Sequence, residues 1–279
     1  MKTVAPTRKI GLIGVLVGIW LACPAVSRAQ QPTAPPEQAE ELAKKLANPV
    51  SDLVSVPFQF NWEQNVGPNE QTRFILNLQP VMPFALNQDW NLIARVIVPL
   101  VSQPPLFDGG TPAFGVSDIL TSFFLSPSGG AVTWGVGPAI SLPSTTIPTL
   151  GTEKWSAGPT AVVLKQKGKM TYGALWNQVW SFFGNTQRAD VNQMFLQPFF
   201  AYQATRTLTV TLQSETTANW EVDDGRWTVP INVIFSKLSS FGVFPTSYQL
   251  GFGGFAEHPD AGPSWKIRGG IVILLPRRR

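Results

Sequence analysis

The sequence predicts an all-β fold: a closed, antiparallel, up-and-down transmembrane β-barrel of about 12 strands, with a short N-terminal helical segment. From residue 50 onward, apolar and polar residues alternate with a period of two, which is typical of strands whose two faces meet different surroundings. The connections between these strands are alternately long and short. An even number of strands with short turns at one end and long loops at the other is the pattern of membrane barrels.

The composition argues against several classes of protein. Of 279 residues, 44% are hydrophobic and 14% are charged, so the bulk of the chain is not disordered. A single Cys and a single His argue against a Cys/His metal site, a disulfide scaffold or a Cys–His nucleophile, and we expect neither a cofactor nor a metal. The net charge of +4 comes from the two ends of the chain rather than from a basic stripe, which argues against a nucleic-acid partner.

Residues 1–29 have the features of a secretory signal peptide. Basic residues precede an apolar run, Ile10–Ala22, that is shorter than the about 20 residues of a membrane-spanning helix. Small residues in Ser27-Arg28-Ala29 predict cleavage after Ala29. A lipoprotein acylated at Cys23 is the alternative, although the residues before Cys23 fit its recognition motif poorly.

Residues 30–49 differ in composition from the rest and are expected to form a periplasmic linker. Gln31–Gln38 is rich in Pro and polar residues, which is typical of a flexible or polyproline-like segment. Residues 40–47 carry Glu before Lys at i,i+4 spacing, which predicts a short helix that ends at Asn48-Pro49. A plug or a partner-binding helix is the alternative to a simple linker.

Residues 50–276 are assigned to the barrel, with 277–279 as a basic tail. In the first strand, Val54, Val56, Phe58 and Phe60 share one face, and polar residues share the other. The polar rows of the strands hold mostly Ser, Thr, Asn, Gln and Gly, whereas the outer face of a soluble β-sandwich should be charged. We therefore expect the apolar rows to face outer-membrane lipid and the polar rows to face a lumen, because only closure pairs every backbone group in hydrocarbon. The facing of the strands near 116–126, 155–166, 171–183, 193–204 and 246–257 stays open.

The tryptophans are expected to mark the membrane interfaces. Five of them lie at the loop-proximal ends of their strands and predict one aromatic girdle, and a sixth lies beside a short turn at the opposite interface. They are Trp62, Trp155, Trp220, Trp227 and Trp265, with Trp90 at the other end. Trp134, Trp176 and Trp180 lie in mid-strand and are interpreted as ordinary core residues. Several prolines fall inside strands, where each removes a ladder hydrogen bond and predicts a bulge or gap.

Several segments together resemble a bacterial family of outer-membrane barrels labelled as phenol-degradation meta-pathway proteins, or misnamed bacterial "neuromedin U". The matching segments include residues 48–53, 56–61 and 67–69, Asp89-Trp90-Asn91-Leu92-Ile93, Trp134-Gly135-Val136-Gly137-Pro138, residues 151–155, 158–162, 172–175 and 188–192, and Phe195-Leu196-Gln197-Pro198-Phe199. The resemblance covers nearly all of residues 42–276. It implies an outer-membrane barrel with a transport role, with no established substrate and no catalytic residues.

The lumen is expected to be lined by the polar side chains of the inward rows. The candidates are Arg73, Arg95, Asp118, Glu215 and Arg268, together with Asn77, Gln79, Gln213 and Asn232. Glu63 and Arg73 flank the first long loop and are placed to pair across strands. The structural alternative is that these charges only neutralise one another inside a closed barrel. A barrel of about 12 strands predicts a narrow path, and Ile93 and Ile97, on the face of Arg95, favour a hydrophobic or amphipathic solute.

Two further function classes stay open. A hydrolase would need a His beside a nucleophile, and His258 shares a loop with Asp260 and Ser264. A surface or structural barrel would use its long loops for contact, and the pair Asp223-Asp224 in one loop is expected to be a solvated turn. We therefore predict an outer-membrane protein that is not an enzyme and that forms a narrow channel or transporter for small hydrophobic or amphipathic compounds.

Overall fold

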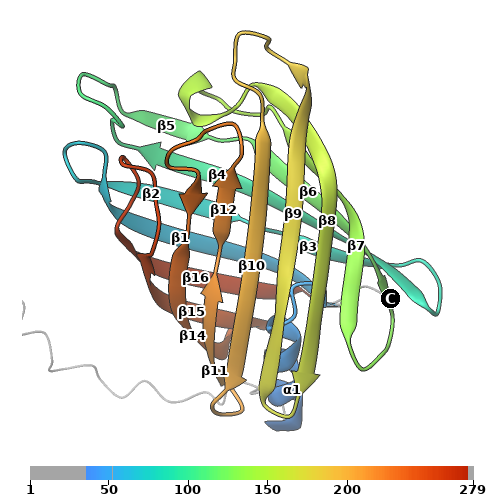
Figure 1. The fold of residues 1–279 in the computed structure, drawn as a ribbon. Helices are drawn as coiled ribbons and strands as arrows, with labels where there is room; N and C mark the ends of the chain where they lie inside the picture. The colour runs from blue at the N-terminus through green and yellow to red at the C-terminus, as the bar shows by residue number, and fades with distance from the viewer. Residues whose placement is uncertain (1–35, 52, 276–279) are drawn as a thin grey trace, which may run out of the picture. The chain divides into compact units, whose positions relative to one another are not determined.

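The computed structural model describes residues 36–51 and 53–275, which form one helix, a short 3-10 helix and sixteen strand segments (Figure 1). Their bounds are α1 Pro36–Leu46, β1 Val54–Val66, β2 Gln71–Leu78, β3 Val81–Ala85, β4 Trp90–Gln103, β5 Ala113–Val116, β6 Ile119–Pro127, β7 Thr133–Leu142, η1 Pro148–Leu150, β8 Lys154–Lys167, β9 Met170–Gly184, β10 Asn192–Gln203, β11 Leu208–Ser214, β12 Thr216–Asn219, β13 Trp227–Thr228, β14 Pro230–Phe241, β15 Phe244–Phe255 and β16 Trp265–Leu275. The predicted signal peptide, the lipoprotein alternative and the basic tail lie outside the described residues.

The strand segments form one closed antiparallel barrel. Four of the strands are interrupted, so that β2 with β3, β5 with β6, β11 with β12 and β13 with β14 each count once and the sixteen segments make twelve strands. Each strand pairs with its neighbours in the sequence, and β1 closes the barrel on β16, with Phe58 opposite Ile271 and Asn61 opposite Arg268. Closure removes every free sheet edge. The predicted twelve-strand fold is confirmed.

The interruptions follow prolines on the same or the neighbouring strand. The break between β2 and β3 contains Pro80, and the amide of Gln79 there donates to the carbonyl oxygen of Pro57 on β1. The break between β5 and β6 is bridged by a hydrogen bond from the Ser117 amide to the carbonyl oxygen of Pro99 on β4. Pro230 opens β14 directly after the break from β13. Prolines inside these strands therefore coincide with local gaps in the ladder, as their missing N–H requires.

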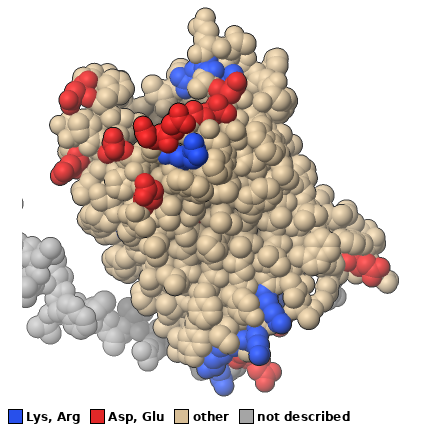
Figure 2. Space-filling view, viewed as in Figure 1, with Lys and Arg blue, Asp and Glu red and all other residues tan. Residues whose placement is uncertain are grey.

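The apolar rows face outward and the polar rows face the axis. Ile231 is 51% exposed and Phe252 is 52% exposed on the outer surface, whereas Asn232 and Arg268 are 1% and 2% exposed on the inner surface. Figure 2 shows the same inversion on the face it views, with charged side chains at the two ends and an uncharged band between them. This distribution is that of a protein whose outer solvent is hydrocarbon.

A charge placed in this outer band is expected to destabilise the barrel. Val233, in the middle of β14, faces outward between Leu212 and Phe252. We expect Val233→Lys to lower the free energy of unfolding in lipid vesicles by about 2–4 kcal/mol, because the ammonium group must enter hydrocarbon. The matched control Val222→Lys, in the exposed loop after β12, should change it by less than about 0.5 kcal/mol. Urea titration of both variants decides this, and equal effects would argue against a lipid-facing β14.

The tryptophans lie near both ends of the barrel wall. Trp62, Trp155, Trp220, Trp227 and Trp265 are between 37% and 44% exposed toward the long-loop end, and the rings of Trp220 and Trp227 meet edge to face at 5.5 Å. At the short-turn end, Trp90 meets Trp134 edge to face at 5.9 Å. The interpretation of Trp134 and Trp180 as core residues is wrong, because they are 39% and 47% exposed on the outer face. Trp134 lies near the start of its strand rather than in the middle, because β7 begins only at Thr133.

The two ends of the barrel differ in their connections. The short turns, such as residues 168–169 and 242–243, share one end with the start of β1 and the end of β16, and the long loops, such as residues 104–112 and 143–153, lie at the other. Helix α1 lies at the short-turn end (Figure 1). It begins at Pro36, so residues 36–38 are helical rather than extended as predicted, and Pro fits the first turn, where its missing N–H is not needed. No helix in the described part of the chain is long and apolar enough to cross a bilayer.

Candidate functional site: the barrel lumen

One side of the lumen carries a buried charge cluster, which we call the Glu215 cluster: Glu215, Lys266, Arg268 and Asn61. The guanidinium of Arg268 donates from Nη1 to Glu215 Oε1 at 2.9 Å and from Nη2 to the other carboxylate oxygen, and from Nε to Asn61 Oδ1 at 2.8 Å. Lys266 Nζ lies 3.4 Å from Glu215 Oε2. Glu215 occupies the break between β11 and β12, so its side chain reaches across the lumen to β16. One carboxylate is therefore shared by two cations.

A second ion pair lies beside the first long loop. Arg73 Nε donates to Glu63 Oε2 at 2.7 Å across β1 and β2, and Arg73 Nη1 donates to Gln103 Oε1 at 3.3 Å on β4. The predicted pairing of Glu63 with Arg73 is present in the structure, where the two residues are direct cross-strand partners. The charges of Arg73 and Glu63 therefore compensate each other at the barrel wall.

The third basic group, Arg95 on β4, has a different environment. Its Nη2 donates to Gln79 Oε1 at 2.7 Å, and Gln79 Nε2 in turn donates to Gln59 Oε1 at 3.3 Å. Among the described residues, no carboxylate lies within ion-pair distance of Arg95. Arg95 therefore stands among neutral amides, in contrast to Arg73 and Arg268.

An apolar cluster lies inside the barrel on other strands. Inward side chains of β3, β4, β6, β8 and β9 form a buried cluster, and Phe195 and Phe199 on β10 pack against it. We call this surface the apolar wall: Val81, Ile93, Phe124, Val162, Leu164 and Leu175, together with Val50 from the segment before β1. The interior thus combines this apolar cluster with the charged Glu215 cluster, which joins β1 and β16 to the break after β11.

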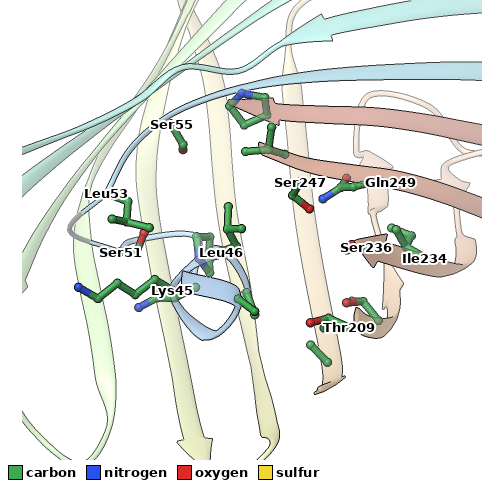
Figure 3. Close-up of a pocket in the computed structure, with 18 of the residues that line it drawn as sticks. Lys45, Leu46, Ser51, Leu53, Ser55, Thr209, Ile234, Ser236, Ser247 and Gln249 are labelled. Atoms are coloured by element: carbon green, nitrogen blue, oxygen red, sulfur yellow. The ribbon is translucent and has the colours of Figure 1, made fainter. Parts of the chain in front are cut away.

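Helix α1 narrows the short-turn end of the lumen. Ala39 and Ala43 are 8% and 6% exposed, and the helix backbone accepts hydrogen bonds from Gln166 and Gln203, whose Nε2 atoms lie 2.9 Å from Lys44 O and 3.3 Å from Glu40 O. A cavity of about 220 Å³ remains between the helix and the barrel. Figure 3 shows Leu46 at the end of the helix, facing Ser247, Ser236 and Thr209 across this space.

A larger cavity of about 530 Å³ lies toward the long loops, which we call the outer chamber. Its lining combines Arg95, Asn177 and Gln193 with apolar side chains that include Ile97, Leu120, Leu175, Val179 and Phe195. Among the described residues, Arg95 is the one that lines both cavities, so its side chain lies between them.

No family model matches the sequence, and no curated protein matches it. Among solved structures, the chain is similar to the COG4313 outer membrane channel from Pseudomonas putida, with a TM-score of 0.60 and 16% identity over 80% of this chain and 94% of that one. It is also similar to the NanC porin, with a TM-score of 0.52 and 8% identity over 80% of this chain and all of that one. The fold is that of outer-membrane channels. At these identities the likeness concerns the fold alone.

Within this channel fold, the predicted lumen-lining residues are placed as follows. Arg95, Gln79, Gln213 and Arg268 line the cavity beside α1, and Arg95 and Asp118 line the outer chamber. Glu215 and Arg73 lie in the two ion pairs, and Asn77 lies opposite Gln59 and Pro99 in the ladder. Asn232 is 1% exposed, and its Nδ2 lies 3.5 Å from the carbonyl oxygen of Gln213.

Sequence reasoning missed three parts of the barrel interior. It did not include Lys266, although this residue lies two positions before Arg268 on the same face. It left the facing of β8 and β9 open, so Ile93 was the one member of the apolar wall that it named as facing the lumen. It favoured a linker over a plug for residues 30–49, whereas α1 packs at the barrel end; the small residues Ala39 and Ala43, four positions apart, are the signal that marks the packed face.

The outer chamber is bounded by loop 143–153, which Asp118 anchors. Both the amide and the hydroxyl of Thr152 donate to Asp118 Oδ2 at 2.7 Å. Next to it, Lys154 Nζ lies 2.8 Å from Asp190 Oδ1 in the loop after β9, and Ser181 donates to the same oxygen at 3.2 Å. These contacts tie two long loops to the barrel rim.

The Asp190 contact is expected to depend on pH. The hydrogen bond from Lys154 lowers the pKa of Asp190 below its ordinary value. A lowered pKa means that the contact is fully present above the unfolded pKa of about 4 and is lost as pH falls through the lower pKa of the folded state. The protection factors of the amides of residues 185–191, which compare their exchange with that of an unstructured chain at the same pH, should therefore fall below about pH 4. Asp190→Asn should already show the low protection factors at neutral pH, and protection factors that do not change with pH in the parent protein would contradict the assignment.

The hydrolase alternative finds no catalytic arrangement. His258 Nδ1 lies 2.8 Å from the carbonyl oxygen of its neighbour Pro259, and within the described chain no hydrogen bond joins it to Asp260 or Ser264. Asp223 is fully exposed and lies 3.7 Å from Arg226, as a solvated turn would be. The described residues also contain no group of three or more His, Cys, Asp or Glu side chains placed to hold a metal.

Proposed function

We propose that this protein is a channel of the outer membrane with a narrow path for small hydrophobic or amphipathic compounds. The observation that carries the proposal is the presence of an apolar cluster and a charged cluster inside the same barrel. A general pore for hydrophilic solutes gains nothing from a buried cluster that contains Phe124, Leu164 and Leu175. A solute with an apolar body and a polar end would meet a matching surface on both sides.

The same interior supports a narrow path rather than an open pore. Twelve strands enclose less space than the sixteen of general porins. Part of that space is filled by α1 at the short-turn end, and part by the Glu215 cluster, whose side chains extend from β11 and β16. The remaining cavities of about 220 and 530 Å³ suit solutes of small-molecule size.

Protein purified from outer-membrane fractions tests the proposal in two assays. In planar bilayers we expect small unit conductance, and in liposomes we expect faster uptake of short-chain amphiphiles than of sugars of similar size. Faster sugar uptake would overturn the amphiphile proposal. Failure to pass ions and every tested solute would favour the alternative, a structural or surface-interaction barrel, for which the filled lumen is the supporting observation. Recovery in the soluble fraction would contradict the location.

A further inference from the structure

The position of Arg95 sets it apart from every other cation in the lumen. Arg73 and Arg268 each bond a carboxylate, and Lys266 shares Glu215 with Arg268. Arg95 donates one side-chain hydrogen bond, to the neutral amide of Gln79. A guanidinium carries five N–H donors in a planar fork, of which one bonds Gln79, and Arg95 lines both cavities.

The surroundings of Arg95 indicate which kind of ligand would bind beside it. Ile97 lies on β4 with Arg95, and Leu120 lies on the neighbouring strand β6. Leu175 on β9 and Phe195 on β10 line the same chamber from the facing strands. A cation with unused donors beside an apolar chamber matches a molecule with an anionic head and an apolar body. A planar carboxylate fits best, because it accepts two parallel hydrogen bonds from one guanidinium.

The one acidic residue of the chamber does not supply this charge. Asp118 directs its Oδ2 to the backbone and side chain of Thr152, and it makes no ion pair with Arg95. Glu215 is already bonded to Arg268 and Lys266. The middle of the lumen therefore holds an excess of positive charge.

We propose that Arg95 and the outer chamber form a binding site for small amphipathic anions, with the carboxylate on the guanidinium and the apolar body against Leu120, Leu175 and Phe195. This proposal specifies the solute class of the proposed channel and rests on the lumen being the solute path. It does not depend on the rate of passage, because binding can be measured without flux.

Calorimetry on the full-length mature protein in lipid nanodiscs, with empty nanodiscs as the blank, tests the site with three probes of equal chain length: hexanoate, hexanol and hexylamine. We expect hexanoate to bind more tightly than hexanol, and hexylamine not to bind detectably. Arg95→Gln should weaken hexanoate binding about tenfold to a hundredfold, the loss expected for one charge-assisted contact, and leave hexanol binding unchanged. Arg95→Lys, which keeps the charge without the fork, should retain part of the preference.

Lys165→Gln is the matched control, because it removes one exposed cation from the outside of the barrel end and should leave hexanoate binding unchanged. Heat-shifted mobility in gel electrophoresis verifies that each variant folds. Equal binding of hexanoate and hexanol, or unchanged hexanoate binding in Arg95→Gln, would overturn the site. Preference for hexylamine would overturn it in favour of Asp118. Uptake of neutral amphiphiles with no preference for carboxylates would support the proposed channel and contradict this site. Binding of hexanoate without uptake would support the site and contradict the channel.

Discussion

Removal of helix α1 is expected to raise the unit conductance of the barrel several-fold. The helix is about 10–12 Å wide with its side chains, and it occupies the end of the lumen where the cavity is reduced to about 220 Å³. Deletion of residues 36–48 leaves Val50 in its apolar contacts and keeps β1 intact. Single-channel recording in planar bilayers measures the change directly. An unchanged conductance would place the narrowest part of the path elsewhere, with the Glu215 cluster as the next candidate.

Two point variants test whether the packing of α1 against the barrel limits the conductance. Ala43 is 6% exposed against the barrel, and Glu41 points away, with 67% of its side chain exposed. Ala43→Glu should therefore displace α1 and raise the conductance toward that of the deletion, because a carboxylate cannot be buried there without a partner. Glu41→Ala changes charge and size on the outer face of the same helix and should leave the conductance as it is.

The fold was predictable because the membrane imposes a strict rule on sequence. Each strand in hydrocarbon must alternate an apolar and a polar row, so a period of two in β1, β4 and β14 reveals both the strand and its facing. The rule fails in parts of β8 and β9, where the inner row is itself apolar: Val162 and Leu164 face the lumen while Val163 faces lipid. When both rows are apolar, alternation carries no information about facing, and the apolar wall was missed for this reason.

The candidate site was predictable in composition but not in arrangement. The inward row identifies Arg73, Arg95 and Arg268 equally. Which of them is paired depends on contacts across the barrel, such as Arg268 with Glu215, 53 residues apart in sequence. These contacts arise from closure and from the break at Glu215, neither of which is encoded in local spacing. The distinct role of Arg95 therefore emerges only in three dimensions.

Neutralising Glu215 is expected to destabilise the folded barrel by about 3 kcal/mol, because breaking a buried ion pair leaves its partners without compensation. Arg268 and Lys266 are 2% and 4% exposed, and both lose the negative charge that they share in Glu215→Gln. Urea unfolding in lipid vesicles measures the loss. Glu221→Gln, in the exposed loop after β12, removes the same charge outside the lumen and should change the stability by less than about 0.5 kcal/mol.

A double variant shows whether Glu215→Gln destabilises the barrel because Arg268 is left buried without a counter-charge, or because separate contacts are lost. If Glu215→Gln acts by leaving Arg268 unpaired, then Arg268→Gln in the same chain removes the uncompensated guanidinium and should restore much of the stability. Asn61 Oδ1, which accepts from Arg268 Nε, can then accept from the new amide instead. If the two losses simply add, the cluster stabilises the barrel through independent contacts. In that case neutralisation by Glu215 is not the reason that the barrel tolerates the two buried cations Arg268 and Lys266.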